Sequence, residues 1–357
     1  MKIAVLRTIC LAATAIAAMA ALVAARGYAA SVGKPTTAVV AKEPVASIEK
    51  LKLQYRRATS IPFPESNRYT IEKATLGKQL FFDTRLSAAN LLSCASCHNP
   101  AYGWGDGQPK GIGHGMRQLD RRSPSIVNVA YGQIFMWDGR ASSLEEQALG
   151  PISADREMNL PIDHLIERLR SIPGYMPEFR AAFPQEGLTP GSIAKAIATY
   201  ERTVVSESAP FDAWIEGDET AISQAAKRGF ELFNDKAACS NCHSGWNFTD
   251  DSFHDTGLAD ADLGRSKFAP GVLKMEHAFK TPGLREIARR GPYMHDGSLP
   301  NLEAVLDHYD NGGINRPSRS DQIEPLHLSQ QEKDDLVAFM TTMTGDMAPT
   351  AVPALPR

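Results

Sequence analysis

The chain is poor in cysteine, with five in 357 residues. One of them, Cys10, lies in an apolar leader near the N-terminus, and the other four fall into two short motifs far apart in the sequence. If these four have another use, no cysteine is left for a structural disulfide. A chain without disulfides must then be stabilised by its core and by the groups that it binds.

A large excess of charge of one sign is also absent. The sequence has 38 Lys and Arg against 41 Asp and Glu, for a formal net charge of −3. Nucleic-acid-binding proteins usually carry a basic excess, so this composition suggests no such partner. After the leader, no apolar run is long enough to span a membrane. Alternating strand patterns are scarce, which favours a mainly α fold.

The first 30 residues have the pattern of a secretory signal peptide. Two basic residues precede an Ala-rich apolar stretch over residues 9–25, and small residues follow, so that cleavage after Ala25 or Ala29 is plausible. The alternative is an uncleaved N-terminal anchor, although the stretch is near the short limit for a membrane span. The signal peptide predicts export, which in a bacterium means the periplasm.

The remaining cysteines form two copies of the motif Cys-x-x-Cys-His. Two thiols at this spacing can form thioether bonds with the vinyl groups of one porphyrin, and the histidine can then be an axial ligand of its iron. A zinc site would join both motifs in one cluster, and a thiol redox motif needs no histidine. The motifs therefore predict two covalently bound haem c groups. The first haem would use Cys94, Cys97 and His98, and the second haem would use Cys239, Cys242 and His243.

A weak internal repeat supports two similar domains. Gly77-Lys-Gln-Leu-Phe-Phe-Asp83 precedes the first motif, and Gly229-Phe-Glu-Leu-Phe-Asn-Asp235 precedes the second. A helix, a haem-attachment motif, loops and a closing helix are the plan of a cytochrome c domain, so we expect two such domains. The predicted division is a signal peptide over 1–30, a linker or N-terminal arm over 31–60, an N-terminal domain with the first haem over 61–215 and a C-terminal domain with the second haem over 216–350.

Apolar periodicity and capping signals place the helices. Ser329-Gln-Gln-Glu332, for example, is a capping box that opens the last one. The expected helices cover residues 71–82, 143–149, 161–171, 189–205, 221–233, 301–310 and 329–344.

Several blocks of this sequence resemble the bacterial dihaem cytochrome c peroxidase/MauG family, in family order from residue 70 to 345. The resemblance implies that the first haem reacts with hydrogen peroxide. The blocks are Arg121-Arg-Ser-Pro-Ser-Ile-Val-Asn128, Phe135-Met-Trp-Asp-Gly-Arg140, Ser143-Leu-Glu-Glu-Gln-Ala148, Arg156-Glu-Met158, Phe279-Lys-Thr-Pro-Gly-Leu-Arg285, Pro292-Tyr-Met-His-Asp-Gly297 and His308-Tyr-Asp-Asn-Gly312.

The resemblance also implies roles for residues near the first haem. Gln147 and Glu157 correspond to the polar pair of the family's distal pocket, where a carboxyl group can pass a proton between the two peroxide oxygens. Trp137 stands where the family has an aromatic residue between the haems. His114 has the spacing of a histidine that ligates the resting first haem in some members, whereas others keep that site open. From the residues alone, the polar pair could be surface groups, and Trp137 could be a core residue.

The other axial ligand of the second haem distinguishes ordinary peroxidases of the family from its MauG-like members. The family places it 14 residues after the histidine of the Pro-Tyr-x-His-Asp-Gly block, here His295, so the position is Tyr309. Ordinary peroxidases have methionine there, and MauG-like members have tyrosine. A thioether favours ferrous iron, whereas a phenolate favours ferric and higher states. Alternative ligands are Met294, Met340 and Met343.

These residues leave three functions to weigh. A MauG-like enzyme would use peroxide to oxidise Trp or Tyr of a partner protein by long-range electron transfer. A dihaem cytochrome c peroxidase would reduce peroxide to water with electrons from a small cytochrome or cupredoxin. An electron carrier would need no proton-handling pocket. Tyr309 favours the first. Many relatives also hold calcium through an Asn at the position of Arg122. Calcium is therefore possible from the resemblance, but this arginine would repel it.

Overall fold

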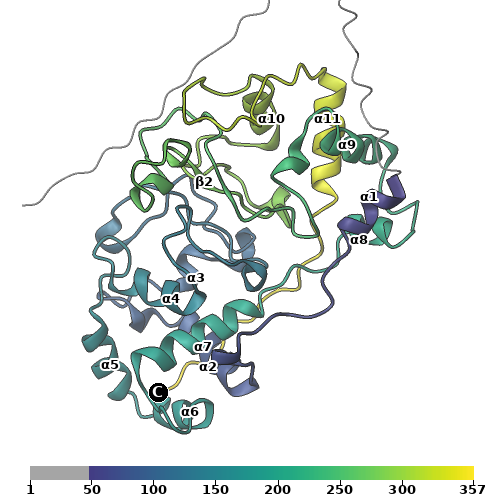
Figure 1. Ribbon diagram of the computed structural model, residues 1–357. Helices are drawn as coiled ribbons and strands as arrows, with labels where there is room; N and C mark the ends of the chain where they lie inside the picture. Colours follow the sequence, from purple (N-terminus) through teal and green to yellow (C-terminus); the bar gives the residue numbers. More distant parts are fainter. Residues whose placement is uncertain (1–47) are drawn as a thin grey trace, which may run out of the picture. The chain divides into compact units, whose positions relative to one another are not determined.

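The computed structural model describes residues 48–357, and these form a mainly helical fold, as the sequence predicts (Figure 1). Within this range the only named strands are a short antiparallel pair, β1 (Phe253–His254) and β2 (Phe279–Lys280). The expected signal peptide and the first part of the expected arm lie outside the described residues. Across residues 48–357, no helix combines the length and the apolar character that crossing a membrane requires.

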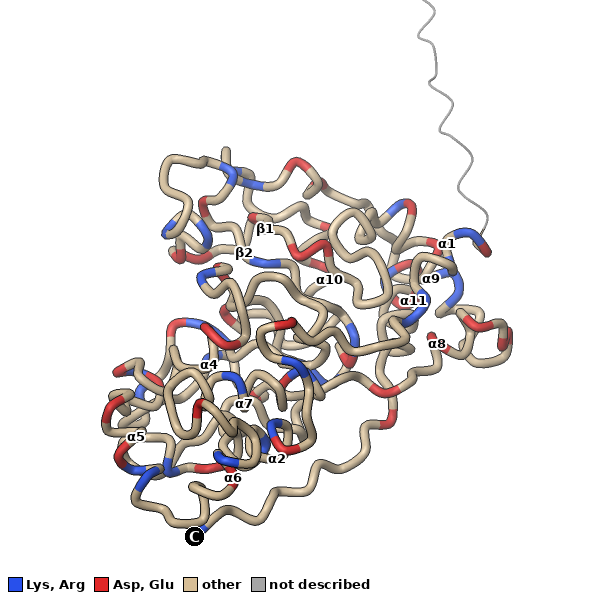
Figure 2. Tube along the Cα trace, turned by 60° about the horizontal axis from the view of Figure 1, so that its bottom comes forward, with Lys and Arg blue, Asp and Glu red and all other residues tan. Residues whose placement is uncertain are grey.

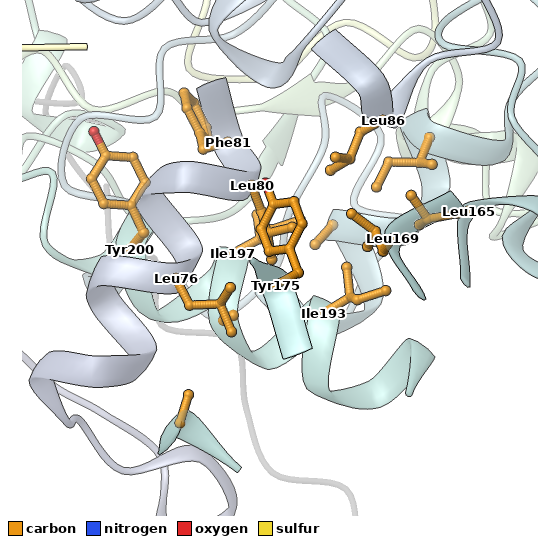
Figure 3. Close-up of a cluster of buried hydrophobic side chains, with 14 of the residues drawn as sticks. Leu76, Leu80, Phe81, Leu86, Leu165, Leu169, Tyr175, Ile193, Ile197 and Tyr200 are labelled. Atoms are coloured by element: carbon orange, nitrogen blue, oxygen red, sulfur yellow. The ribbon is translucent and has the colours of Figure 1, made fainter. Parts of the chain in front are cut away.

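The first core surrounds the crossing of α2 (Ile71–Phe82) and α7 (Pro190–Arg202). The Thr70 side chain caps α2, and Thr189 opens α7 with a capping box, so both helices begin where their free backbone N–H groups find acceptors. Figure 3 shows the packed apolar side chains of this core, including Leu80. The helices α4 (Leu144–Ser153), α5 (Ile162–Arg170) and α6 (Tyr175–Ala182) complete it.

The second core surrounds α9 (Gln224–Asn234) and α11 (Gln330–Thr341), which lie side by side in Figure 1. It is rich in aromatic residues. The rings of Phe230 and Phe339, for example, meet edge to face with centroids 5.5 Å apart. The other helices of this core are α1 (Ile48–Gln54), α8 (Pro210–Ile215) and α10 (Leu302–Asp310).

The repeated glycines of the sequence lie at the two helix crossings. A Cβ on Gly77 would stand 1.9 Å from the carbonyl oxygen of Ala196 on α7, and a Cβ on Gly229 would stand 2.0 Å from that of Asp335 on α11. No real side chain fits at these distances. The internal repeat therefore reflects a shared packing requirement. In each domain the two main helices cross so closely that their backbones are in contact.

Both ends of the described chain pack on a core. Tyr55, just after α1, is buried in the second core, so this part of the expected arm is ordered. The C-terminal tail returns to the first core, where the carbonyl of Arg357 accepts a hydrogen bond from the N–H of Gly174 at 2.8 Å (Figures 1 and 2). The domain division at residue 215 stays a prediction. The packing of α8 on the second core favours assigning that helix to the C-terminal domain.

Most expected helices are present with shifted ends. The helix expected over 143–149 continues through Pro151 to the end of α4, and the one expected over 221–233 starts later because Ser223 caps α9. The helix expected over 189–205 ends earlier, with α7. We did not predict α6, which follows α5 after a short turn.

Long loops and short helical turns connect these helices. Figure 2 shows acidic and basic residues interspersed along the trace, in keeping with the near-balanced charge. The short turns are α3 (Cys94–Cys97) and the 3-10 helices η1 (Glu65–Asn67), η2 (Thr84–Leu86), η3 (Pro100–Tyr102), η4 (His114–Met116), η5 (Val129–Tyr131), η6 (Cys239–Asn241), η7 (Arg265–Lys267), η8 (Leu273–Met275) and η9 (Ile287–Arg289).

Candidate functional site

One cavity of about 640 Å³ is lined by residues of both Cys-x-x-Cys-His motifs. Its wall includes residues of both cores, for example Ile197 on α7 and Leu306 on α10. Binding sites of this size usually hold a cofactor or ligand against apolar walls with a few polar groups. The fold thus brings together two motifs that are far apart in the sequence.

The two motif histidines are held in the same way. Nδ1 of His98 lies 3.3 Å from the carbonyl oxygen of Trp104, and Nδ1 of His243 lies 2.9 Å from that of Phe248. A carbonyl oxygen can only accept a hydrogen bond, so the Nδ1 atom of each ring must be the donor. Each ring therefore carries its proton on Nδ1 and presents Nε2 as a ligand. Burial lowers the pKa of both imidazoles, which favours the neutral form that binds metal.

Two buried arginines in the cavity wall lack an anionic partner. Arg122 and Arg290 are 5% and 8% exposed, and among the described residues neither forms an ion pair. The Nε atom of each has no hydrogen-bond acceptor. Burial lowers the pKa of both, and the charge of Arg122 helps to lower that of Arg290 to about 10. Haem propionates would supply the missing carboxylates, so these residues fit the cofactor.

The predicted polar pair of the first haem lies at the cavity. Gln147 is on α4, Glu157 follows that helix closely, and both line the wall. Burial raises the pKa of Glu157, and only Arg140 opposes this effect. A carboxyl group with a raised pKa can both accept and donate a proton near neutral pH. The structure therefore places both residues of the pair in the cavity wall, with Glu157 near enough to Cys97 to raise the pKa of its thiol.

Trp137 also lines the cavity, and hydrogen bonds to backbone groups hold its loop. Its indole N–H donates to the carbonyl of Arg122 at 2.8 Å. The N–H of Arg122 donates to the carbonyl of His295, and the N–H of Lys280 donates to the carbonyl of Trp137, both at 2.8 Å. His295 stacks on Phe279, with ring centroids 3.4 Å apart. The N-terminal half thus holds the loop of His295, and the C-terminal half holds the loop of Trp137.

Tyr309, on α10, lines the cavity on the side of the second motif. Burial is the main cause that raises the pKa of its phenol, and the nearby thiols of Cys239 and Cys242 raise it further. Two of the alternative ligands, Met294 and Met340, line the same cavity. The third, Met343, is fully buried in the second core and is not part of the wall.

His114 does not line the cavity. It opens η4, and its backbone N–H donates to the carbonyls of Arg156 and Glu157 at 3.1 and 2.7 Å. The loop of His114 is therefore close in space to Glu157, although the two are far apart in the sequence. A role of His114 as an axial ligand stays a prediction.

Sequence reasoning missed two groups beside the motifs. Glu201, on α7, is buried in the cavity wall, and the only sequence signal is its position four residues after the apolar Ile197. Asp250 and His254 lie within metal-ligand reach of Cys242. A thioether bond to haem would commit that sulfur, so this cluster belongs to the haem site.

A mainly helical chain whose two Cys-x-x-Cys-His motifs share one cavity has the features of a two-haem cytochrome of the c type. Comparison with known proteins agrees. Residues 71–220 match the family model described as di-haem cytochrome c peroxidase, and residues 226–344 match the one described as cytochrome c.

Relatives define the branch. The methylamine utilization protein MauG of Methylorubrum extorquens is 50% identical over 95% of this chain and 97% of its own. The cytochrome c551 peroxidase of Pseudomonas aeruginosa is 34% identical over 80% and 82%. A solved MauG-like protein associated with microbial copper homeostasis superposes with a TM-score of 0.75 at 31% identity, covering 81% of this chain and 95% of its own.

The chain therefore belongs to the dihaem cytochrome c peroxidase family, in its MauG-like branch. It is a haem peroxidase-type oxidoreductase that carries two covalently bound haem c groups. These findings confirm the family, the fold class and the cofactor predicted from the sequence. The roles of individual residues are proposals, developed next.

Proposed function

We propose that this enzyme acts in the periplasm, where it uses hydrogen peroxide to oxidise Trp or Tyr side chains of a partner protein by long-range electron transfer. Cys94 and Cys97 would hold the first haem, with His98 as a ligand of its iron. Cys239 and Cys242 would hold the second haem, with His243 and Tyr309 as ligands of its iron. The single observation that carries the proposal is the buried phenol of Tyr309 beside the second motif.

When bound, the haem irons supply a site for peroxide and a store for two oxidising equivalents. The chain supplies the proton handling. Glu157 would accept a proton from one oxygen of the peroxide and return it to the other oxygen, which would leave as water. Its raised pKa suits both steps. The Gln147 amide, on the same wall, can orient the peroxide by hydrogen bonding.

Trp137 provides the aromatic ring between the two haem sites. It lines the shared cavity, and both its indole N–H and its carbonyl are tied to backbone groups of neighbouring loops. A fixed ring can carry an electron without reorganising. The partner protein then need not enter the cavity, because electrons can travel through the protein to the haems.

A second candidate function is peroxide reduction with electrons from a small redox protein, as the name of the cytochrome c551 peroxidase indicates for that relative. Met294 and Met340 line the cavity and could provide the thioether ligand that this function favours. An anionic phenolate stabilises oxidised iron instead. A haem that stays oxidised is a poor relay for electrons from a small redox protein.

The Tyr309→Met variant tests the proposal. We expect ascorbate to leave the second haem of the wild type oxidised and to reduce that of the variant, while the first haem still reacts with peroxide. Partner oxidation should fall at least tenfold. Met294→Leu and Met340→Leu are the controls and should leave the spectrum of the second haem unchanged. A wild-type second haem that ascorbate reduces, or a control that loses its ligand, would favour the peroxidase function.

The partner is best sought among proteins suggested by the relatives. One relative is named for methylamine utilization and another is associated with copper homeostasis. Purified candidates from each process, treated with holoenzyme and peroxide, should gain oxygen or lose hydrogen at Trp or Tyr, as measured by peptide mass spectrometry. A holoenzyme without peroxide is the control.

A further inference from the structure

Glu201 is a carboxylic acid in the wall of the haem cavity that the proposed mechanism does not use. It is 4% exposed, and its Oε2 atom has no hydrogen-bond donor. On α7 it follows Ile197 by four residues, so both side chains share the helix face that lines the cavity. An unpartnered buried carboxylate is costly, so the group must be protonated or compensated by a charge that the cofactor brings.

The nearest cation is already paired. Arg202, next in the sequence, forms two hydrogen bonds to Glu145 of α4, at 2.6 and 3.0 Å. Burial raises the pKa of Glu201 to about 8, and Glu145 adds to the rise while Arg202 opposes it. The other titratable groups coupled to Glu201 are Tyr200 on α7 and Cys94 on α3. None of these neighbours neutralises the carboxyl group.

Glu201 also lies on the side of the first haem. The thiol of Cys94 is electrostatically coupled to Glu201, whereas the thiol of Cys97 is coupled to Glu157. The two carboxyl groups thus flank the first attachment motif. Glu157 has the nearby charge of Arg140, whereas the cation beside Glu201, Arg202, is paired with Glu145, so a change of charge at the first haem would act on Glu201 without a free cation to offset it.

We propose that Glu201 is the proton acceptor coupled to reduction of the first haem. On reduction, an electron from an external donor enters the iron of this haem, and the Glu201 carboxylate takes a proton from solvent. On oxidation, the electron leaves the iron and the proton leaves Glu201. The inference rests on the proposed attachment of the first haem at Cys94 and Cys97, and it does not depend on oxidation of a partner protein.

The charge of the iron determines the direction in which the reduction potential changes with pH. Oxidised iron carries one more positive charge, which favours the carboxylate, so the pKa of Glu201 is lower with oxidised than with reduced haem. Between these two pKa values, reduction takes up a proton, and the reduction potential of the first haem falls as the pH rises. Outside that interval the potential is independent of this group.

The experiment is a redox titration of each haem in the purified holoenzyme on both sides of pH 8. We expect the first haem of the wild type to take up close to one proton per electron in part of this range. Glu201→Gln should abolish that dependence. Glu145→Gln frees Arg202 to compensate Glu201, so it should keep the dependence but move it to lower pH. An unchanged pH dependence in Glu201→Gln would overturn the inference.

Infrared difference spectroscopy of the wild type needs no variant to fold. The reduced-minus-oxidised spectrum should contain the band of a protonated carboxyl group, and its absence would contradict the proposal. Glu201→Gln should remove this band and Glu157→Gln should keep it, whereas the reverse result would assign the proton to Glu157. Haem counting by mass spectrometry separates these outcomes from failure of attachment, because a chain without haem at Cys94 and Cys97 disproves the attachment on which the inference rests.

Discussion

The rings of Trp137 and His295, which both line the haem cavity, meet edge to face, with centroids 6.4 Å apart and planes at 68°. They occupy equivalent positions in two matching turns, Phe135-Met-Trp-Asp-Gly139 and Tyr293-Met-His-Asp-Gly297. The methionine before each ring has a left-handed backbone, with φ of 71° and 70°. The internal repeat thus extends to the cavity wall, where one copy carries an indole ring and the other an imidazole ring.

The Trp137→Phe variant should separate peroxide reaction from protein oxidation. Phenylalanine is much harder to oxidise than tryptophan, so we expect partner oxidation to fall at least tenfold while the first haem reacts with peroxide at the normal rate. Loss of the hydrogen bond to Arg122 should cost about 1 kcal/mol of stability. Rapid mixing with peroxide, followed by assay of the partner, measures both steps. Trp246→Phe is the control, because Trp246 packs on Tyr131 outside the cavity wall. Equal activity of the two variants would remove Trp137 from the route.

The Glu157→Gln variant should slow the reaction with peroxide by at least tenfold, since lost acid–base help typically costs about 10² or more. In the wild type the rate should rise with pH through a pKa above the usual value for glutamate, because burial raises it and the base must be ionised. That pH dependence should vanish in the variant. Stopped-flow absorbance is the measurement, and Glu146→Gln, at an exposed residue of α4, is the control. An unaltered rate would show that Glu157 is not the base.

Alanine at either helix-crossing glycine should destabilise the protein. Gly77→Ala and Gly229→Ala each place a methyl group within about 2 Å of a carbonyl oxygen in the partner helix, so the helices must move apart. We expect losses of about 1–3 kcal/mol in the free energy of unfolding. Gly150→Ala, in α4 with open space around it, should instead stabilise by up to about 1 kcal/mol, because alanine is the better helix former. Chemical denaturation of the holoenzyme distinguishes these signs, and stabilisation at all three sites would contradict the packing argument.

Arg121 should contribute stability that acid removes. It bonds to Asp262 at 2.6 Å and to Asp138 at 2.5 Å. Burial would raise the pKa of Asp262, but Arg121 and Lys267 outweigh it and hold the pKa below its usual value. The contribution is therefore present above the ordinary aspartate pKa of about 4 and is lost as the pH falls toward the folded value.

We expect Arg121→Gln to cost about 2 kcal/mol at neutral pH, because it removes the buried cation that Asp138 and Asp262 share and leaves each with one more exposed partner, Arg140 or Lys267. The difference from the wild type should shrink as the pH is lowered. Unfolding at several pH values measures both effects. Arg156→Gln, which breaks an exposed pair with Asp120, should cost less than about 1 kcal/mol. A pH-independent cost at Arg121 would mean that lost packing, and not charge, is responsible.

The sequence by itself determined the chemistry of the attachment sites and the helical plan. The spacing of Cys94, Cys97 and His98 is local, and so are the caps that start the main helices, so both can be recognised without a fold. It also indicated the family, which the comparisons confirm. Helix ends were less exact, and α6 was missed, because packing on the core extends or shortens a helix beyond its local signals.

Only the tertiary structure decided which distant groups share one low-dielectric space. The unpaired guanidinium groups of Arg122 and Arg290 and the carboxyl group of Glu201 look like ordinary surface charges in the sequence. Folding buries them beside both motifs, where their cost is compensated only by a cofactor or by a proton. Burial and proximity between distant segments depend on the whole fold, and no short pattern of residues encodes them.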